Sequence, residues 1–166
     1  AGDEAGYLAQ PHAEAFSIAR NNGLGITVHA GEAGGTDNVL YAIEKLKATR
    51  IGHGIRSIES QDLVKLLKQR QVLLELCPTS NVHTKTVDSI KNHPVSKFYN
   101  EGVPISIGDD DPITSRTSVS RELTLLENKF GFGIKDIITI QKMSIEAAFI
   151  TDQRLKKKLL RTVSSV

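Results

Sequence analysis

Short apolar runs alternate with longer amphipathic segments along most of the chain. Each run is followed by glycine, proline or polar residues typical of turns, which indicates a buried strand rather than a helix. The predicted strands cover residues 24–28, 50–54, 72–77 and 103–107. We expect them to pair in parallel, because strands that alternate with helices are joined by right-handed crossovers.

Apolar side chains recur at helical spacing between the strands and after the last one. The predicted helices cover residues 11–22, 36–46, 59–69, 94–100, 118–129, 134–150 and 152–162. Residues 79–92 are polar and predict a loop, with a helical turn near 87–90. The helices beyond residue 118 follow the final strand, so we expect them to be additions to the repeating strand–helix pattern.

Polar residues follow every predicted strand, and two α/β architectures place ligands there. Both a barrel and an open doubly wound sheet bind ligands at the carboxyl ends of parallel strands. A dinucleotide-binding sheet needs a GxGxxG turn after a strand, and residues 31–35 do not supply one. We therefore predict an α/β fold that forms part of a TIM (β/α)8 barrel, which in full needs about 250 residues.

The composition, with 39% apolar and 24% charged residues, is that of one globular domain spanning residues 1–166. The net charge of +2 is too small to predict a nucleic-acid surface, and no apolar run is long enough to predict a membrane span. The single cysteine, Cys77, follows an apolar run and predicts a buried thiol. We expect a cytoplasmic protein that acts on a small molecule, with no nucleic-acid or membrane partner.

The segment His29-Ala30-Gly31-Glu32 contains candidate catalytic chemistry. An apolar strand delivers His29 to its end, and Gly31 lets the chain turn so that Glu32 lies beside it. Neutral histidine is a common zinc ligand, and a glutamate that does not bind the metal is the usual acid/base in zinc-dependent base deamination. Alone, the segment is better explained as a hydrogen-bonded histidine at a strand end beside a helix N-terminal charge. The polar residues after the other strands favour the functional interpretation.

Five short motifs occur in an order that resembles the adenosine deaminase family. They are residues 1–4 (AGDE), 29–32 (HAGE), 50–54 (RIGHG), 77–81 (CPTSN) and 110–112 (DDP). The first resembles the family's loop after the fourth barrel strand, so the resemblance implies the C-terminal half of a TIM barrel with extra C-terminal helices. Because residue 1 is not methionine, we expect the chain to be a piece of a longer protein.

The resemblance implies a zinc site and a purine nucleoside substrate, adenosine or deoxyadenosine. His29 and Asp110 resemble zinc ligands, and Glu32 resembles the acid that protonates purine N1. His53 resembles the residue that takes a proton from, and orients, the metal-bound water. Zinc lowers the pKa of bound water toward about 7, which provides hydroxide for attack at purine C6.

Further residues are assigned to binding and positioning. By resemblance, Gly2 approaches purine N3 through its backbone and Asp111 recognises purine N7. Glu75 lies in an apolar strand, where a carboxylate is costly unless it is paired. It is either half of a structural salt bridge or, by resemblance, a partner of His53, while Ser80 helps to orient a ligand. The histidines expected at the surface or at helix caps are His12, His83 and His93.

The chain departs from the family pattern in its metal ligands. The family's His-x-His pair has no counterpart, which leaves two implied ligands where catalytic zinc normally has three. The chain alone is therefore expected to bind zinc weakly and to be inactive. Gly52 favours adenosine, because related adenine deaminases carry aspartate there. The alternatives are a non-catalytic half barrel that self-associates through exposed strand edges, and another metal-dependent hydrolase of this fold, such as an adenine deaminase.

Overall fold

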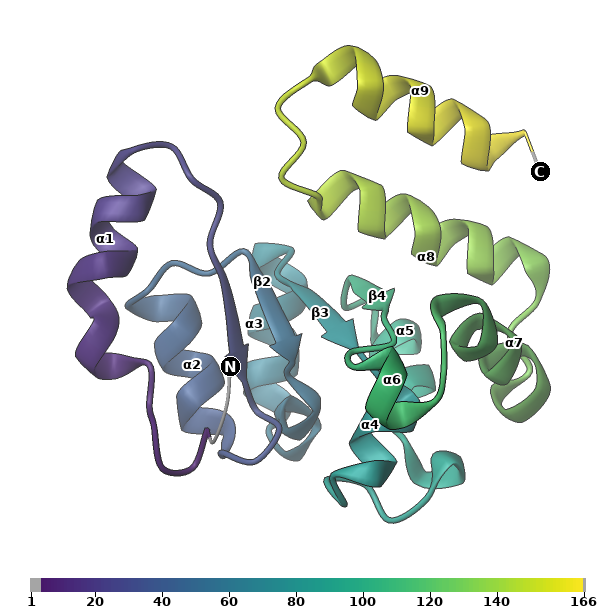
Figure 1. Ribbon diagram of the computed structural model, residues 1–166, viewed down its shortest axis with the longest axis horizontal. Coiled ribbons are helices and arrows are strands. Elements are labelled where there is room, and N and C mark those ends of the chain that lie inside the picture. The colour runs from purple at the N-terminus through teal and green to yellow at the C-terminus, as the bar shows by residue number, and fades with distance from the viewer. Residues whose placement is uncertain (1–3, 166) are drawn as a thin grey trace.

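One parallel sheet lies at the centre of the computed structural model, which describes residues 4–165 (Figure 1). Its strands, paired in the order β1-β2-β3-β4, are β1 (Thr27–Ala30), β2 (Arg50–His53), β3 (Leu73–Leu76) and β4 (Ile105–Ile107). Each strand lies beside its successor in the sequence, as consecutive units of a barrel do, whereas a doubly wound sheet reverses its order at a switch point. β1 and β4 are the edges of the sheet within the described residues, and self-association through them stays a prediction.

The strand register gives the sheet an apolar face and a polar face. The apolar row, in which every side chain is buried, is Val28, Ile51, Leu74 and Ile105. Side chains alternate along a strand, so the neighbouring row points to the other face. The polar row, which is partly exposed, is His29, Gly52, Glu75 and Ser106. The polar face is therefore the one that carries predicted site residues.

Amphipathic helices pack against the apolar face and complete the core. They are α2 (Thr36–Glu44), α3 (Gln61–Arg70) and α5 (Val95–Glu101). Val39, Leu67 and Phe98 from these helices are fully buried in one cluster with the strand residues. Burying such a side chain stabilises a fold by about 1.5–3 kcal/mol. The core thus fixes the strands whose ends carry the site.

The remaining helices flank the sheet and its loops. The longer ones are α1 (Ala13–Asn21), α7 (Val119–Phe130), α8 (Ile134–Ala147) and α9 (Gln153–Ser164). The short ones are α4 (Pro78–His83), α6 (Pro112–Ser115) and the 3-10 turns η1 (Gln10–His12), η2 (Ile55–Glu59) and η3 (Ile90–Asn92). Figure 1 shows α9 folded back along α8. Within residues 4–165, no helix has the length and apolarity to cross a membrane.

Several predicted boundaries differ from the structure, and two of them differ for clear local reasons. β1 begins at Thr27 and not at residue 24, because Gly23 (φ +77°) ends α1 and the N–H of Leu24 donates back to the carbonyl of Ala19 at 3.1 Å. The predicted loop 79–92 opens with the helix α4. Pro78 ends β3, but it also occupies the first helical turn, a position that suits proline.

Candidate active site

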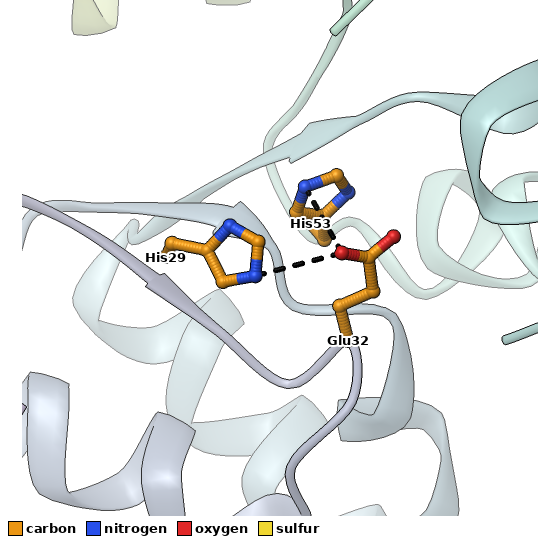
Figure 2. A group of neighbouring side chains, drawn as sticks. All are labelled: His29, Glu32 and His53. Carbon is orange, nitrogen blue, oxygen red and sulfur yellow. Dashed lines mark ion pairs between the residues drawn. The ribbon is translucent and has the colours of Figure 1, made fainter. Parts of the chain in front are cut away.

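His29, Glu32 and His53 meet at the carboxyl ends of β1 and β2, as Figure 2 shows. Oε2 of Glu32 lies 3.5 Å from Nε2 of His29 and 3.5 Å from Nε2 of His53. The two imidazole rings are in edge contact, with centroids 4.7 Å apart. The structure therefore brings together the residues that the sequence assigned to metal binding and proton transfer on these two strands.

Two tight turns hold these side chains in place. Gly31 has φ +75°, and a Cβ there would lie 2.5 Å from Cγ2 of Val39, so this turn requires glycine. His53 also has a positive φ of 61°, which is uncommon for a residue with a side chain and is found at functional sites. The N–H of Gly54 donates to the carbonyl of Ala30 at 2.9 Å and ties the second turn to the first.

The carboxylate of Glu4 supports the turn that carries Glu32. It accepts hydrogen bonds from the N–H groups of Gly31 (2.6 Å), Glu32 (2.9 Å) and Gly34 (2.9 Å), and from Nδ2 of Asn38 (3.0 Å). Burial raises the pKa of Glu4, but the hydrogen bonds outweigh burial and the pKa is lowered overall. Glu4 is therefore an ionised support for the turn that carries Glu32.

Glu4→Gln is expected to lower the free energy of unfolding by about 1.5–3 kcal/mol at neutral pH, the usual contribution of hydrogen bonds to a charged group. An amide offers one acceptor oxygen where the carboxylate offers two. Because the folded pKa of Glu4 lies below its ordinary value of 4.5, the stabilisation is complete above that value and is lost as the pH falls through the folded pKa.

The measurement for Glu4→Gln is urea unfolding of the chain at neutral and at acid pH. Glu14→Gln, at an exposed position of α1, is the matched control and should leave stability unchanged. Equal stability of the wild type and Glu4→Gln at neutral pH would show that the four hydrogen bonds contribute nothing net. Sequence reasoning missed Glu4 and assigned Gly2 instead, which lies outside the described residues.

Glu32 and His53 share a partner in α4. Nδ2 of Asn81 lies 3.0 Å from Oε1 of Glu32 and 3.1 Å from Nδ1 of His53. Oγ1 of Thr84 donates to the same glutamate oxygen at 3.0 Å. Oε1 of Glu32 is thus held by the protein, whereas Oε2 faces the two imidazoles. The CPTSN motif contains Asn81, but no spacing rule connects it to a glutamate 49 residues away.

His93 is buried, so the expectation of a surface or cap position is wrong for this histidine. It is 3% exposed, and its Nε2 lies 3.2 Å from Oδ1 of Asn81. Burial lowers the pKa of His93 to about 4, so the ring is neutral at pH 7. The segment after α4 folds back over the site, and this long-range packing cannot be inferred from a lone histidine.

Asp110 and Ser80 are hydrogen-bonded to each other. Oγ of Ser80 donates to Oδ2 of Asp110 at 2.7 Å, which directs the carboxylate toward α4. Among the described residues, the candidate ligand atoms that lie within 4.8 Å of one another come from His29, Glu32 and His53, a set that omits Asp110. This set differs from the implied pair of His29 and Asp110. The metal-binding role of Asp110 stays a prediction, with Ser80 as its support.

Asp111 is exposed and caps α6. Its Oδ1 accepts from the N–H groups of Ile113 and Thr114 at 3.1 Å, and its Oδ2 accepts from Oγ1 of Thr114 at 2.7 Å. The hydrogen bond from the Thr114 side chain is the main reason why the pKa of Asp111 is lowered. Both oxygens are engaged in capping, so the proposed contact with purine N7 stays a prediction.

Glu75 forms a structural salt bridge, which is one of the two roles that the sequence allowed for this residue. Its Oε1 lies 2.9 Å from Nε of Arg50, and Oγ1 of Thr27 donates to its Oε2 at 3.1 Å. The implied role as a partner of His53 is not what the structure gives, because Nδ1 of His53 faces Asn81. The register explains the difference: Glu75 lies opposite Gly52, on the polar face, within reach of charged and hydroxyl groups nearer the amino ends of the strands.

Cys77 is a buried thiol, as predicted. Burial is the main cause, with Asp110 the next, of a pKa raised to about 12. The thiol is therefore neutral at physiological pH. Since only the thiolate is a strong nucleophile or metal ligand, Cys77 contributes neither function here.

The donor atoms at the strand ends are suited to a divalent metal such as zinc. Burial lowers the pKa of His29, and the neighbouring His53 lowers it further, so the imidazole of His29 is neutral and keeps a lone pair for a metal. The carboxylate of Glu32 adds an oxygen donor from the loop after β1. Histidine nitrogen and carboxylate oxygen are the usual protein ligands of catalytic zinc.

Comparisons with known proteins match the whole chain. The family model described as "Adenosine deaminase" covers residues 1–166. An adenosine deaminase of Clostridium acetobutylicum is 42% identical over 162 residues, which is 96% of this chain and 48% of that protein. An adenine deaminase of Rhizobium etli is 40% identical over 161 residues, which is 97% of this chain and 50% of that protein.

A solved structure has the same arrangement of strands and helices. The crystal structure of adenine deaminase from Arthrobacter aurescens superposes with a TM-score of 0.94 and 31% identity, covering 99% of this chain and 50% of that one. The chain therefore spans about half the length of the curated relatives it matches. The match over residues 1–166 and the shared sheet and helices show that the chain belongs to the adenosine deaminase family, as about half of its TIM barrel.

Proposed function

We propose that the whole protein containing this chain catalyses the zinc-dependent hydrolytic deamination of adenosine and deoxyadenosine in purine salvage in the cytoplasm. Because the chain spans about half of its relatives, the activity is assigned to the whole protein and not to 166 residues alone. One observation supports the proposal most strongly: Oε2 of Glu32 lies 3.5 Å from Nε2 of both His29 and His53. An acid, a metal ligand and a water-orienting group are thus within reach of one heterocycle.

We infer that His29 and Asp110 hold zinc, while Glu32 is reserved for proton transfer. Oε1 of Glu32 accepts hydrogen bonds from Asn81 and Thr84, which leaves Oε2 as the oxygen that can carry a proton. When bound, zinc supplies Lewis acidity, which lowers the pKa of a coordinated water toward about 7.

The side chains of this chain supply a proton and orientation in the proposed reaction. Oε2 of Glu32 gives a proton to N1 of the purine, so the ring can accept an electron pair as the water oxygen bonds to C6. His53 orients the attacking water. The bond from C6 to the amine then breaks, and the amine leaves as ammonia with one proton from the water. The other water proton returns to Glu32, and the product keeps the water oxygen and the proton on N1.

The test is an assay of the whole protein with adenosine, followed by the loss of the adenosine ultraviolet band. Conversion in the presence of zinc, and its loss after chelation, would support the proposal. Zinc-loaded protein that leaves adenosine untouched but hydrolyses a different substrate would overturn it.

Adenine is the second candidate substrate, because relatives of both substrate classes match the chain about equally well. Gly52 favours adenosine. It lies between His29 and Glu75 in the sheet, and a Cβ there would lie 3.4 Å from Cα of His29, an ordinary contact. The fold therefore tolerates a side chain at this position, and glycine leaves room beside His29 for the larger nucleoside.

Gly52→Asp in the whole protein is expected to lower the ratio of kcat/KM for adenosine to that for adenine by about 10-fold or more. Adding or removing a small group in a fitted pocket changes discrimination by about 1–3 kcal/mol. Gly52→Asn has the same size without the charge, so it separates the effect of volume from that of charge. A ratio that stays at the wild-type value in both variants would show that Gly52 does not select the substrate.

A further inference from the structure

We propose that Asn81 and His93 are positioning residues that hold His53 in one tautomer and fix the Glu32 carboxylate beside it. The assignment deepens the proposed function and rests on it for its catalytic meaning. The hydrogen-bonding pattern itself can be tested without any reaction.

The carboxamide of Asn81 uses both of its N–H groups at the candidate site. Asn81 is fully buried, and its Nδ2 faces Oε1 of Glu32 at 3.0 Å and Nδ1 of His53 at 3.1 Å. An amide nitrogen is only a donor, so Nδ1 of His53 must accept. The ring proton of neutral His53 is therefore on Nε2, the atom that lies 3.5 Å from Oε2 of Glu32.

His93 determines which way the Asn81 amide points. The N–H of Val95 donates to Nδ1 of His93 at 3.2 Å, so the proton of neutral His93 is on Nε2. That Nε2 then donates to Oδ1 of Asn81 at 3.2 Å. The reversed amide would place an N–H against the His93 donor and a carbonyl oxygen against the Glu32 carboxylate. The backbone at Val95 thus sets the orientation of each side chain in turn.

The surroundings of His93 keep this pattern in a single state. The ring is 3% exposed and lies edge-on to Phe130, with centroids 6.4 Å apart. A second ring proton would sit against the N–H of Val95, where there is no acceptor. His93 is therefore a neutral donor with one hydrogen, which is the form that the Asn81 carbonyl needs.

The assigned tautomer narrows the role of His53. With a proton on Nε2 and Nδ1 bonded to Asn81, the neutral ring offers no lone pair to a metal or to a water proton. It can instead donate a hydrogen bond from Nε2 and so orient an attacking water. The sequence-based expectation combined proton removal with orientation, and the hydrogen bonds of Asn81 favour orientation alone.

The test is nitrogen-15 NMR of the whole protein with labelled histidine, at neutral pH and before zinc is added. The nitrogen-15 chemical shifts of the imidazole ring distinguish a protonated nitrogen from an unprotonated one. The wild type is expected to show His53 protonated on Nε2. In Asn81→Asp the carboxylate can only accept, so the proton of His53 is expected on Nδ1. Asn100→Asp, at an exposed position of α5, is the matched control and should leave the His53 signals unchanged.

A second pair of variants covers the case in which Asn81→Asp does not fold. His93→Gln keeps an N–H donor and is expected to retain the wild-type tautomer, whereas His93→Phe removes the donor and is expected to give a mixture at His53. Protonation of Nδ1 in the wild type, or one unchanged tautomer in every folded variant, would overturn the proposal. Protonation of Nε2 in a protein without deaminase activity would support the positioning and overturn only the proposed function.

Discussion

Glu32→Gln in the whole protein is expected to lower kcat for adenosine by about 10²- to 10⁴-fold, the usual contribution of a positioned general acid. Glutamine has the size of glutamate, and its amide oxygen can accept the hydrogen bonds that Asn81 and Thr84 donate to Oε1. The amide cannot give a proton to purine N1. Zinc content is expected to stay at the wild-type level, because zinc is assigned to His29 and Asp110.

Turnover and zinc content of Glu32→Gln should be measured on the same sample. Glu127→Gln, at an exposed position of α7, is the control and should behave as the wild type. Wild-type turnover in Glu32→Gln would remove this residue from the mechanism. Loss of zinc together with turnover would make Glu32 a ligand, which its place within 4.8 Å of donor atoms from His29 and His53 allows.

The fold was predictable where the spacing of apolar residues and the turn residues after each strand indicate the secondary structure. Buried strands such as β3 read as apolar runs, and their alternation with helices predicts parallel pairing. The errors occur where a local cap decides the structure. Gly23 and Leu24 belong to the turn that ends α1, so β1 begins later than predicted. Pro78 both ends a strand and begins a helix.

The candidate site was predictable for residues at the carboxyl end of a strand. His29 in β1 and His53 at the end of β2 are such residues, because the carboxyl ends of parallel strands meet at one edge. Glu4, Asn81 and His93 were not assigned, since they act through hydrogen bonds to residues far away in the sequence. Such contacts follow no period and depend on how loops fold back over the strand ends.

The polar row of the sheet shows why the residue type alone did not predict the role of each residue. Glu75 and His29 lie on the same face, at the two sides of Gly52. Glu75 is paired with Arg50 at 2.9 Å, whereas His29 lies beside Glu32 at 3.5 Å. A carboxylate in an apolar strand needs a partner, but the strand register decides which one it finds.

His29→Gln is expected to weaken zinc binding by the whole protein more than about 100-fold. Removing only the hydrogen-bonding partner of a ligand costs about 10- to 100-fold in affinity, and His29 is assigned as a ligand itself. Glutamine nearly preserves the volume at the end of β1 but lacks the imidazole lone pair. Turnover is expected to fall with zinc occupancy and to recover in part when excess zinc is added.

Zinc affinity for His29→Gln is measured by competition with a chelator, and His12→Gln, at an exposed position of η1, is the control. Wild-type affinity with reduced turnover would place His29 on the substrate rather than on the metal. Glu32→Gln should lose turnover and keep zinc, whereas His29→Gln should lose both. The two variants therefore distinguish the acid from the ligand, although Oε2 and Nε2 lie only 3.5 Å apart.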